Sequence, residues 1–333
     1  MPKLMAFLWL FMLFSATSVW AGGSFYGVQP GAGPEVEGKI TEWSVPTPRF
    51  ARDPAPAPDG SIWITVMNAD KLARFDLITK RFKEFDLPRG TRPHGALADP
   101  DGQVWYTGFG NGTIGKLDPA SARVTEYPLP SGGDPHTLVL DPRGIIWFTV
   151  LSGDRIGRLD PKSSRVMEYP IPTRGGRPYG ITLDREGNVW FCEIGASKLG
   201  KLEPGTGAIT EITLPPDSLP RRMATSPVDG SIWVTLYGHG KLLRLDPPTG
   251  KTREWLLPAG SGANPYAVTV DGQGIVWVNE FSANTIVRFD SRTEQFRVFK
   301  LPTANAGVRK MAVDSQGRLW YMGSHNGKLG LIQ

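Results

Sequence analysis

Four histidines are the side chains of this chain best suited to accept a proton near neutral pH: His94, His136, His239 and His325. A neutral imidazole is a good proton acceptor and a good metal ligand at that pH, and a nearby carboxylate can orient it. His94 and His136 each follow a proline, in Arg92-Pro93-His94 and Asp134-Pro135-His136, and they are 42 residues apart. This spacing indicates two imidazoles at equivalent points of a repeated unit.

Other polar side chains stand at comparable points of the sequence. Basic side chains in the loops that enter the inner strands could bind a carboxylate or a phosphate through charge-assisted hydrogen bonds: Arg92, Arg177, Arg221, Arg222, Arg309 and Lys310. Of these we select Arg92, Arg177 and Arg222, with Tyr179 and Tyr266, as the candidate substrate contacts. Glu193 and Glu280 each follow a tryptophan by three residues, and with Asp134 they offer the oxygen ligands that a divalent cation prefers. These residues are the candidate substrate-binding and metal-binding side chains.

Seven tryptophans predict the elements that position these side chains. They recur at intervals of 42 to 44 residues, at Trp63, Trp105, Trp147, Trp190, Trp233, Trp277 and Trp320. A period of about 40 to 45 residues built from short strands is typical of a propeller blade. The 40 glycines and 30 prolines suit the many tight turns of such a fold. We therefore expect an all-β chain that forms one seven-bladed β-propeller over residues 36–333.

Each repeat divides into four strands. In the third repeat, apolar runs around Thr137-Leu138-Val139 and Trp147-Phe148 are separated by Asp141-Pro142-Arg143-Gly144, a tight-turn sequence. The last repeat lacks its outer strand, whereas residues 39–46 form a strand without a blade. Because unpaired strands would leave open edges, we expect this N-terminal strand to pair with the last blade and close the ring.

The order of strands in an antiparallel blade sorts the loops between the two faces of the ring. The loops that enter the innermost strands and the loops that leave the second strands open on one face, near the central channel. All four histidines belong to these loops, so we expect them on that face. Proline and imidazole could equally serve to cap the channel mouth, and the arginines could form a structural network with Asp134, Glu193 and Glu280.

The ends and the composition of the chain indicate where it works. Lys3, an apolar stretch from Leu4 to Phe14 and a small residue at Ala21 resemble a secretory leader, so we expect a signal peptide over residues 1–21, an extension over 22–35 and a periplasmic or secreted location. The apolar stretch is too short for a comfortable membrane span. A single cysteine, Cys192, excludes an intrachain disulfide.

The charge pattern limits the partners. The formal net charge is +5, but the lysines and arginines form no run, which argues against nucleic acid and weakly favours an anionic ligand. The sequence also has no phosphate-binding glycine loop, no zinc-spaced cysteine and histidine cluster and no nucleophile-elbow serine. We expect a small-molecule ligand at the channel mouth and a monomer that does not bind a membrane once the leader is removed.

The repeat resembles that of the virginiamycin B lyase, or streptogramin lyase, family. The resemblance rests on Arg92-Pro93-His94-Gly95, Val104-Trp105-Tyr106-Thr107 and residues 113–119 and 125–130, and it extends over nearly all of the mature chain. It implies a seven-bladed propeller and a carbon–oxygen lyase that opens a cyclic depsipeptide antibiotic at its ester by elimination, an antibiotic-resistance activity. It also implies a histidine proton acceptor, here His136, a second histidine that contacts substrate, here His94, and Mg²⁺ held by carboxylates that include Asp134.

Two features differ from the family pattern. The family has its histidine pair in the last two repeats, whereas His94 and His136 stand in the second and third. The second carboxylate expected after the tryptophan of the base-bearing repeat is missing, because Thr149, Val150 and Leu151 follow Phe148. Two other functions therefore stay open: a non-catalytic periplasmic propeller that binds an anionic small molecule or a protein partner, and a metal-dependent hydrolase resembling gluconolactonases.

Overall fold

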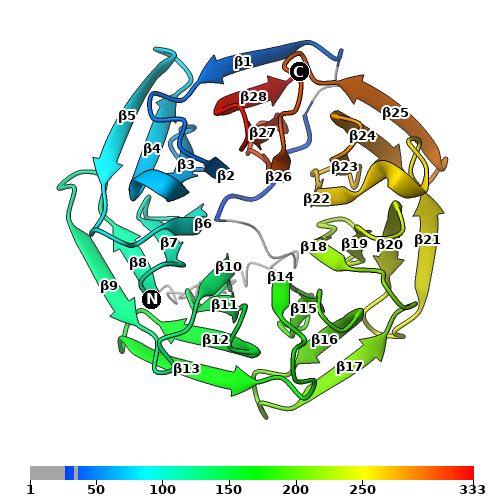
Figure 1. Cartoon of the computed structure of the whole chain (residues 1–333), viewed down its shortest axis with the longest axis horizontal. Helices are drawn as coiled ribbons and strands as arrows, with labels where there is room; N and C mark the ends of the chain where they lie inside the picture. The colour runs from blue at the N-terminus through cyan, green and yellow to red at the C-terminus, as the bar shows by residue number, and fades with distance from the viewer. Residues whose placement is uncertain (1–26, 34–36) are drawn as a thin grey trace, which may run out of the picture.

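The computed structural model describes residues 27–33 and 37–333. In this part of the chain, seven four-stranded antiparallel sheets stand around a common axis (Figure 1). The predicted seven-bladed propeller is confirmed. The leader predicted over residues 1–21 and residues 22–26 and 34–35 of the predicted extension lie outside the described residues. The two helices in the described part are short 3-10 turns, η1 (Met67–Ala69) and η2 (Ser261–Ala263), and neither is long enough to cross a membrane.

The strands of the blades follow one another along the chain from the axis outward. The first three blades are β2 (Ala51–Pro56), β3 (Ile62–Val66), β4 (Lys71–Asp76) and β5 (Arg81–Asp86); β6 (Pro93–Ala98), β7 (Val104–Gly108), β8 (Thr113–Leu117) and β9 (Val124–Pro128); and β10 (Pro135–Leu140), β11 (Ile146–Val150), β12 (Arg155–Asp160) and β13 (Arg165–Pro170). The next three are β14 (Pro178–Leu183), β15 (Val189–Glu193), β16 (Lys198–Leu202) and β17 (Ile209–Thr213); β18 (Pro220–Thr225), β19 (Ile232–Leu236), β20 (Lys241–Leu245) and β21 (Thr252–Leu256); and β22 (Pro265–Val270), β23 (Val276–Glu280), β24 (Thr285–Asp290) and β25 (Gln295–Lys300).

The seventh blade joins the two ends of the chain. It consists of β26 (Val308–Val313), β27 (Leu319–Gly323), β28 (Lys328–Ile332) and β1 (Ile40–Ser44). β1 pairs with β28 in antiparallel register from Ile40 opposite Ile332 to Ser44 opposite Lys328 (Figure 1). Trp43 of β1 packs 4.9 Å from Phe75 and 6.1 Å from Trp320, measured between ring centroids. The predicted ring closure is therefore confirmed.

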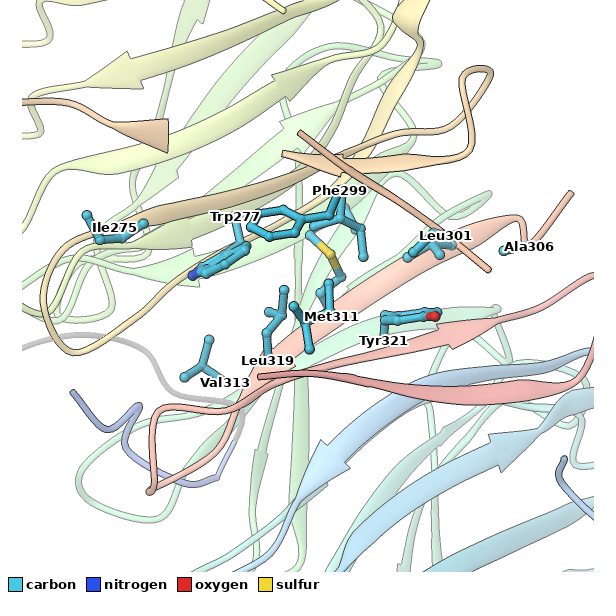
Figure 2. Packing of buried hydrophobic residues seen from close by; sticks show 13 residues of the cluster. Ile275, Trp277, Phe299, Leu301, Ala306, Met311, Val313, Leu319 and Tyr321 are labelled. Atoms are coloured by element: carbon cyan, nitrogen blue, oxygen red, sulfur yellow. The ribbon is translucent and has the colours of Figure 1, made fainter. Parts of the chain in front are cut away.

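The apolar core lies between neighbouring blades. Figure 2 shows one such interface, where Trp277 and Phe299 of the sixth blade face Met311, Leu319 and Tyr321 of the seventh. A four-stranded sheet cannot bury both of its faces alone, so each blade uses its neighbours as cover. Burial of apolar surface between blades is the main term that holds the ring together.

The turns between the first and second strands of the blades repeat one arrangement. We call the side of the ring that bears them the turn face. In four blades the aspartate of the turn accepts a hydrogen bond from the indole of the blade's tryptophan; the four pairs are Asp99 with Trp105, Asp184 with Trp190, Asp271 with Trp277 and Asp314 with Trp320. The same aspartates bond the backbone of their own turns. They are turn formers, in agreement with the turn chemistry of the sequence.

The segment 27–33 lies against the turn face. Gly31 donates its amide to the carbonyl of Asp314, and the carbonyl of Gly31 accepts the amide of Gly272. A side chain at Gly27 would collide with the carbonyl of Ala98, at the end of β6. The dark blue trace in Figure 1 accordingly runs across the centre of the ring between the second blade and the last two. The segment therefore covers the turn-face end of the ring axis.

Candidate functional site

A bulge in every innermost strand decides which side chains point to the ring axis. In β6, Pro93 lies opposite Gly108 and Ala96 opposite Tyr106, so the inner strand has one residue more than its partner between these pairs. The register shifts at the same place in the other six inner strands. Such a bulge re-aims side chains. As a result, the neighbours Arg221 and Arg222 both lie over the Tyr179 ring, at 5.7 and 5.5 Å.

Side chains of the second strands satisfy the backbone that the bulges leave unpaired. Thr107 accepts the amide of Gly95 at 2.8 Å and donates to the carbonyl of His136, on the next blade, at 2.9 Å. The equivalent residues Thr65, Thr149, Thr235 and Asn279 make the same two kinds of contact. Five of the seven bulges are therefore fixed to the following blade, which gives the side chains near the axis a rigid support.

Fourteen bulge residues thus surround the axis. The first of each pair lies nearer the face that bears the loops into the inner strands, which we call the loop face: Arg52, His94, His136, Tyr179, Arg221, Tyr266 and Arg309. The second residues are Asp53, Gly95, Thr137, Gly180, Arg222, Ala267 and Lys310. We call these fourteen residues the axial cluster.

The rings of His94 and His136 are in contact in the axial cluster. Their centroids are 3.6 Å apart with the ring planes tilted by 39°, and each side chain is about 2% exposed. Tyr179 contacts the other side of this pair, with its centroid 4.0 Å from that of His136. The sequence predicted equivalent positions for the two histidines, and the structure brings their rings into contact. His239 and His325, the other two histidines, lie in the loops of the same face, where they bond Pro216 and Asn305.

Both rings of this pair are neutral near pH 7. Burial lowers the pKa of His94 well below its ordinary value, and Arg52 and the neighbouring His136 lower it further. Burial, Arg222 and Arg52 do the same for the pKa of His136. The Nδ1 atom of His94 lies 2.9 Å from the carbonyl oxygen of His136. A carbonyl only accepts, so Nδ1 carries the proton and Nε2 keeps the lone pair.

A buried group of charged side chains lies next to the histidines, on their turn-face side. Arg222 reaches across the axis from β18 and donates to Thr137 at 2.7 Å and to Asp53 at 3.3 Å. The ammonium group of Lys310 lies 4.0 Å from Asp53 and donates to the carbonyl of Ala96. Burial lowers the pKa of Lys310 to about 8, which leaves it charged at neutral pH. The Asp53 carboxylate thus holds together side chains from three blades.

Two tyrosines and two arginines complete the cluster. The hydroxyls of Tyr179 and Tyr266 hydrogen bond to each other. The guanidinium of Arg221 lies 4.7 Å from the Tyr266 ring, and that of Arg309 lies 5.3 Å from the same ring. Burial would raise the pKa of Tyr266, but the surrounding guanidiniums, led by Arg52 and Arg222, lower it to about 7.

A family model identifies the chain. The model of the virginiamycin B lyase family matches residues 32–261 and again residues 189–333. The chain belongs to the virginiamycin B lyase family. None of the curated proteins matches it.

Solved structures of this family have the same fold. A streptogramin B lyase structure is 29% identical, with a TM-score of 0.82 over 89% of this chain and 97% of that one. Virginiamycin B lyase from Staphylococcus aureus is 26% identical, with a TM-score of 0.82 over 89% and 99% of the two chains. A catalytically inactive histidine-to-alanine variant of that protein with quinupristin is also 26% identical, with a TM-score of 0.80 over the same shares.

Five of the side chains proposed from the sequence meet in the axial cluster of this family member: His94, His136, Tyr179, Arg222 and Tyr266. Arg92 and Arg177 do not join them. Both are exposed on the loop face, one residue before an inner strand, with φ of 45° and 53°. Their backbone amides bond the carboxylates of Asp70 and Asp154, respectively. They border the loop-face end of the axis.

The three carboxylates proposed as metal ligands lie in separate surroundings. Asp134 accepts two hydrogen bonds from Ser152, and Glu280 accepts them from Ala259 and Thr285. Glu193 is fully buried, and neither of its oxygens has a hydrogen-bond partner among the described residues. Burial, with Glu211 nearby, raises the pKa of Glu193 to about 8, which keeps this carboxyl protonated.

The donor set of these carboxylates therefore does not fit the Mg²⁺ ion that the family resemblance implies. Mg²⁺ needs oxygen ligands that meet at one point in octahedral geometry, and Asp134, Glu193 and Glu280 belong to three different blades with separate partners. Within residues 27–33 and 37–333, no three histidine, cysteine or acidic side chains gather in a way that could hold a metal ion.

Sequence reasoning missed Arg52 and Asp53, and it named Arg221, Arg309 and Lys310 as possible anion ligands without selecting them as site residues. A signal for the first two was present: Arg52 precedes Trp63 by the same distance as His94 precedes Trp105. The bulge was not visible in the sequence, because simple strand alternation turns only one of two neighbouring residues toward the axis. Cys192 is buried at the position held by Thr107 in the second blade.

Proposed function

We propose that this family member opens the ester ring of a cyclic depsipeptide by elimination, with a histidine of the His94–His136 pair as the proton acceptor. The observation that carries the proposal is the pair of buried, neutral imidazoles in contact on the ring axis. A general base must be unprotonated at the working pH, and burial beside guanidiniums meets that requirement.

The hydrogen bonds of the pair determine which nitrogen is available. His94 donates from Nδ1 to a carbonyl, so its Nε2 is an acceptor. The Nδ1 of His136 lies 2.9 Å from the hydroxyl oxygen of Thr137, which has two lone pairs and already accepts a bond from Arg222. Donation from His136 to the second lone pair would leave its Nε2 free as well. His136 remains the base proposed from the sequence, with His94 as the substrate contact, and single variants separate the two roles.

The elimination balances without water. The imidazole takes a proton from the carbon next to the carbon that bears the ester oxygen. The electrons of that C–H bond form a C=C bond, and the C–O bond breaks to release a carboxylate. The inactive histidine-to-alanine variant of the S. aureus virginiamycin B lyase supports a histidine in this role. No step is assigned to Mg²⁺, because the candidate ligands do not meet; an assay with and without a chelator tests the ion.

The experiment follows quinupristin by liquid chromatography with mass spectrometry after incubation with the protein, so that a ring-opened isomer is seen as a separate peak. Elimination opens the ring without a change in mass, whereas hydrolysis adds one water. We expect His136→Ala to abolish ring opening and His94→Ala to reduce it, with melting temperatures close to that of the unsubstituted protein. His239→Ala is the matched control, because His239 lies on the same face outside the axial cluster. An unchanged rate in both cluster variants would falsify the proposal.

Export is a second part of the proposal. Its support is the sequence from Lys3 to Ala21, which lies outside the described residues. Expression of the full chain in a bacterium, followed by separation of periplasm and cytoplasm, tests it. We expect the periplasmic form to begin at Gly22.

A further inference from the structure

The axial cluster holds more positive than negative charge. Five of its side chains are cationic: Arg52, Arg221, Arg222, Arg309 and Lys310. One is an acid, Asp53, and it is the carboxylate partner in each ion pair that the described structure records for these cations. Arg222 and Lys310 have partners, whereas Arg221 and Arg309 lie outside these ion pairs. A charge removed from water without a counter-ion costs free energy, and a bound anion would offset that cost for Arg221 and Arg309.

Arg221 and Arg309 show where an anion would sit. Neither forms an ion pair within the described residues, although both are half-buried. Arg221 lies 4.2 Å from the Tyr237 ring and 4.7 Å from the Tyr266 ring. Arg309 lies 5.0 Å from the Phe281 ring, and in the described part of the chain its hydrogen bonds go to two uncharged groups, Ser324 and His325. Aromatic rings thus pack against both guanidiniums, and neither guanidinium has a carboxylate partner among the described residues.

Arg52, on β2 of the first blade, is the third guanidinium of the candidate anion site. It is 5% exposed, and its Nη2 atom has no hydrogen-bond partner among the described residues. Its Nε atom lies 3.8 Å from Asp53, too far for a hydrogen bond. Arg52 and Arg309 flank the Phe50 ring, at 5.2 and 5.3 Å. A buried guanidinium with unused donors is a ready partner for carboxylate or phosphate oxygens.

We propose that the axial cluster binds the carboxylate or phosphate group of a small molecule between Arg52, Arg221 and Arg309, beside the hydroxyl of Tyr266. The aromatic rings of Tyr237 and Phe281, next to the two half-buried arginines, suit a ligand with an apolar or aromatic body. The inference goes beyond the proposed elimination, because it rests on charge and geometry and needs no catalysis. A ring that only binds would satisfy it.

Calorimetric titration of the full chain with three matched probes tests the proposal. Benzoate provides a carboxylate, phenyl phosphate a phosphate, and benzyl alcohol the same ring without charge. We expect at least one anion to bind about tenfold or more tightly than the alcohol, since charge-assisted hydrogen bonds supply the difference. The preferred anion identifies the group. Binding of neither anion, or equal affinity for the alcohol, overturns the proposal, and this comparison needs no variant.

Variants locate the site. Arg221→Met and Arg309→Met should each weaken anion binding about tenfold or more and leave the weak binding of the alcohol unchanged. Arg165→Met is the control, because Arg165 is exposed on the outer strand β13. Circular dichroism checks folding, and Arg221→Lys, which keeps the charge but not the planar fork, provides a milder substitution. Equal affinity in the two variants and the control places the anion elsewhere and contradicts the proposal.

The pH dependence of benzoate binding is a further test. Tyr266 is surrounded by titratable and charged groups from every neighbouring element: Arg52 on β2, Tyr179 on β14, Arg221 and Arg222 on β18, Tyr237 after β19 and Arg309 on β26. Its pKa lies at about 7, so the phenol becomes an anion as the pH rises. A phenolate would compete with benzoate, and affinity should fall above pH 7. Tyr266→Phe should remove the fall; a pH-independent affinity in the unsubstituted protein would contradict a site beside Tyr266.

Discussion

The two faces of the ring are built from the same repeat but use it differently. On the turn face, four blades place an aspartate under the tryptophan indole, with distances between 2.8 and 3.1 Å. At the loop-face end of the axis, the equivalent residue changes from blade to blade among arginine, histidine and tyrosine. The residues that repeat from blade to blade stabilise the fold of the ring. The residues that differ between blades give the candidate site its particular set of side chains.

The axial residues on the loop-face side include charged and titratable side chains that are buried, whereas such side chains are usually exposed. Around one axis lie two buried histidine rings in contact, an arginine whose donors are partly unused among the described residues, and a tyrosine with a lowered pKa. Groups with perturbed pKa values gather at functional sites. The turn face, where most carboxylates bond their own turns, shows the structural use of the same residue types.

Deletion of residues 36–46 tests the scaffold half of this comparison and should have the largest effect. It removes β1, exposes the edge of β28 and leaves Trp320 without Trp43. We expect a loss of roughly 5 kcal/mol or more of unfolding free energy, since large core losses reach this size. Thermal unfolding followed by circular dichroism measures it. An unchanged melting temperature would show that the pairing of β1 with β28 is not needed for the stability of the ring.

Asp53→Asn tests whether the axial cluster also contributes to stability. The change leaves Arg222 and Lys310 buried without their shared carboxylate. We expect a loss of about 3 kcal/mol or more in urea unfolding. The matched control is Glu294→Gln, which breaks the exposed pair with Arg253 and should cost about 1 kcal/mol or less. Equal costs would mean that Asp53 is no better coupled than a surface charge.

Asp314→Ala against Asp141→Ala tests the turn face, with the smallest expected effect. Both aspartates bond their turn and a nearby arginine, but Asp314 also accepts the Trp320 indole, whereas the indole of Trp147 has no partner in the described structure. The difference in unfolding free energy should be about 1 kcal/mol, the net contribution of one buried hydrogen bond. A larger loss for Asp141→Ala would contradict the assigned role of the indole bond.

The fold was readable from the sequence because its signals are local and repeated. Tryptophans at one period, Asp-Gly turns and the unmatched strand at residues 39–46 each specify a short-range feature, and the ring follows from their sum. Strand order alone also placed the four histidines on one face. The contact between His94 and His136 followed from their equivalent positions in adjacent blades.

The site was harder to predict from the sequence, because it depends on contacts between distant blades. Arg222 bonds Asp53 and Thr137 across the axis, and nothing near these residues in the sequence connects them. Glu193 and Glu280 matched each other in sequence, yet each is held within its own blade: Glu193 is buried near Glu211, and Glu280 bonds Thr285. The bulge that turns two adjacent side chains toward the axis leaves no clear mark in the hydrophobic pattern.

The seam between β1 and β28 also sets when the site can exist during folding. Arg52 lies in the first blade and Arg309 in the last, and they face each other around Phe50 only when the ring is closed. The chain must therefore be synthesised almost to its end before these two guanidiniums meet, because the closing contact joins the most distant parts of the ring. A ligand held between these two guanidiniums would bind the closed ring and not the open, partly folded chain. Binding would therefore shift the equilibrium between the open and the closed ring toward the closed one.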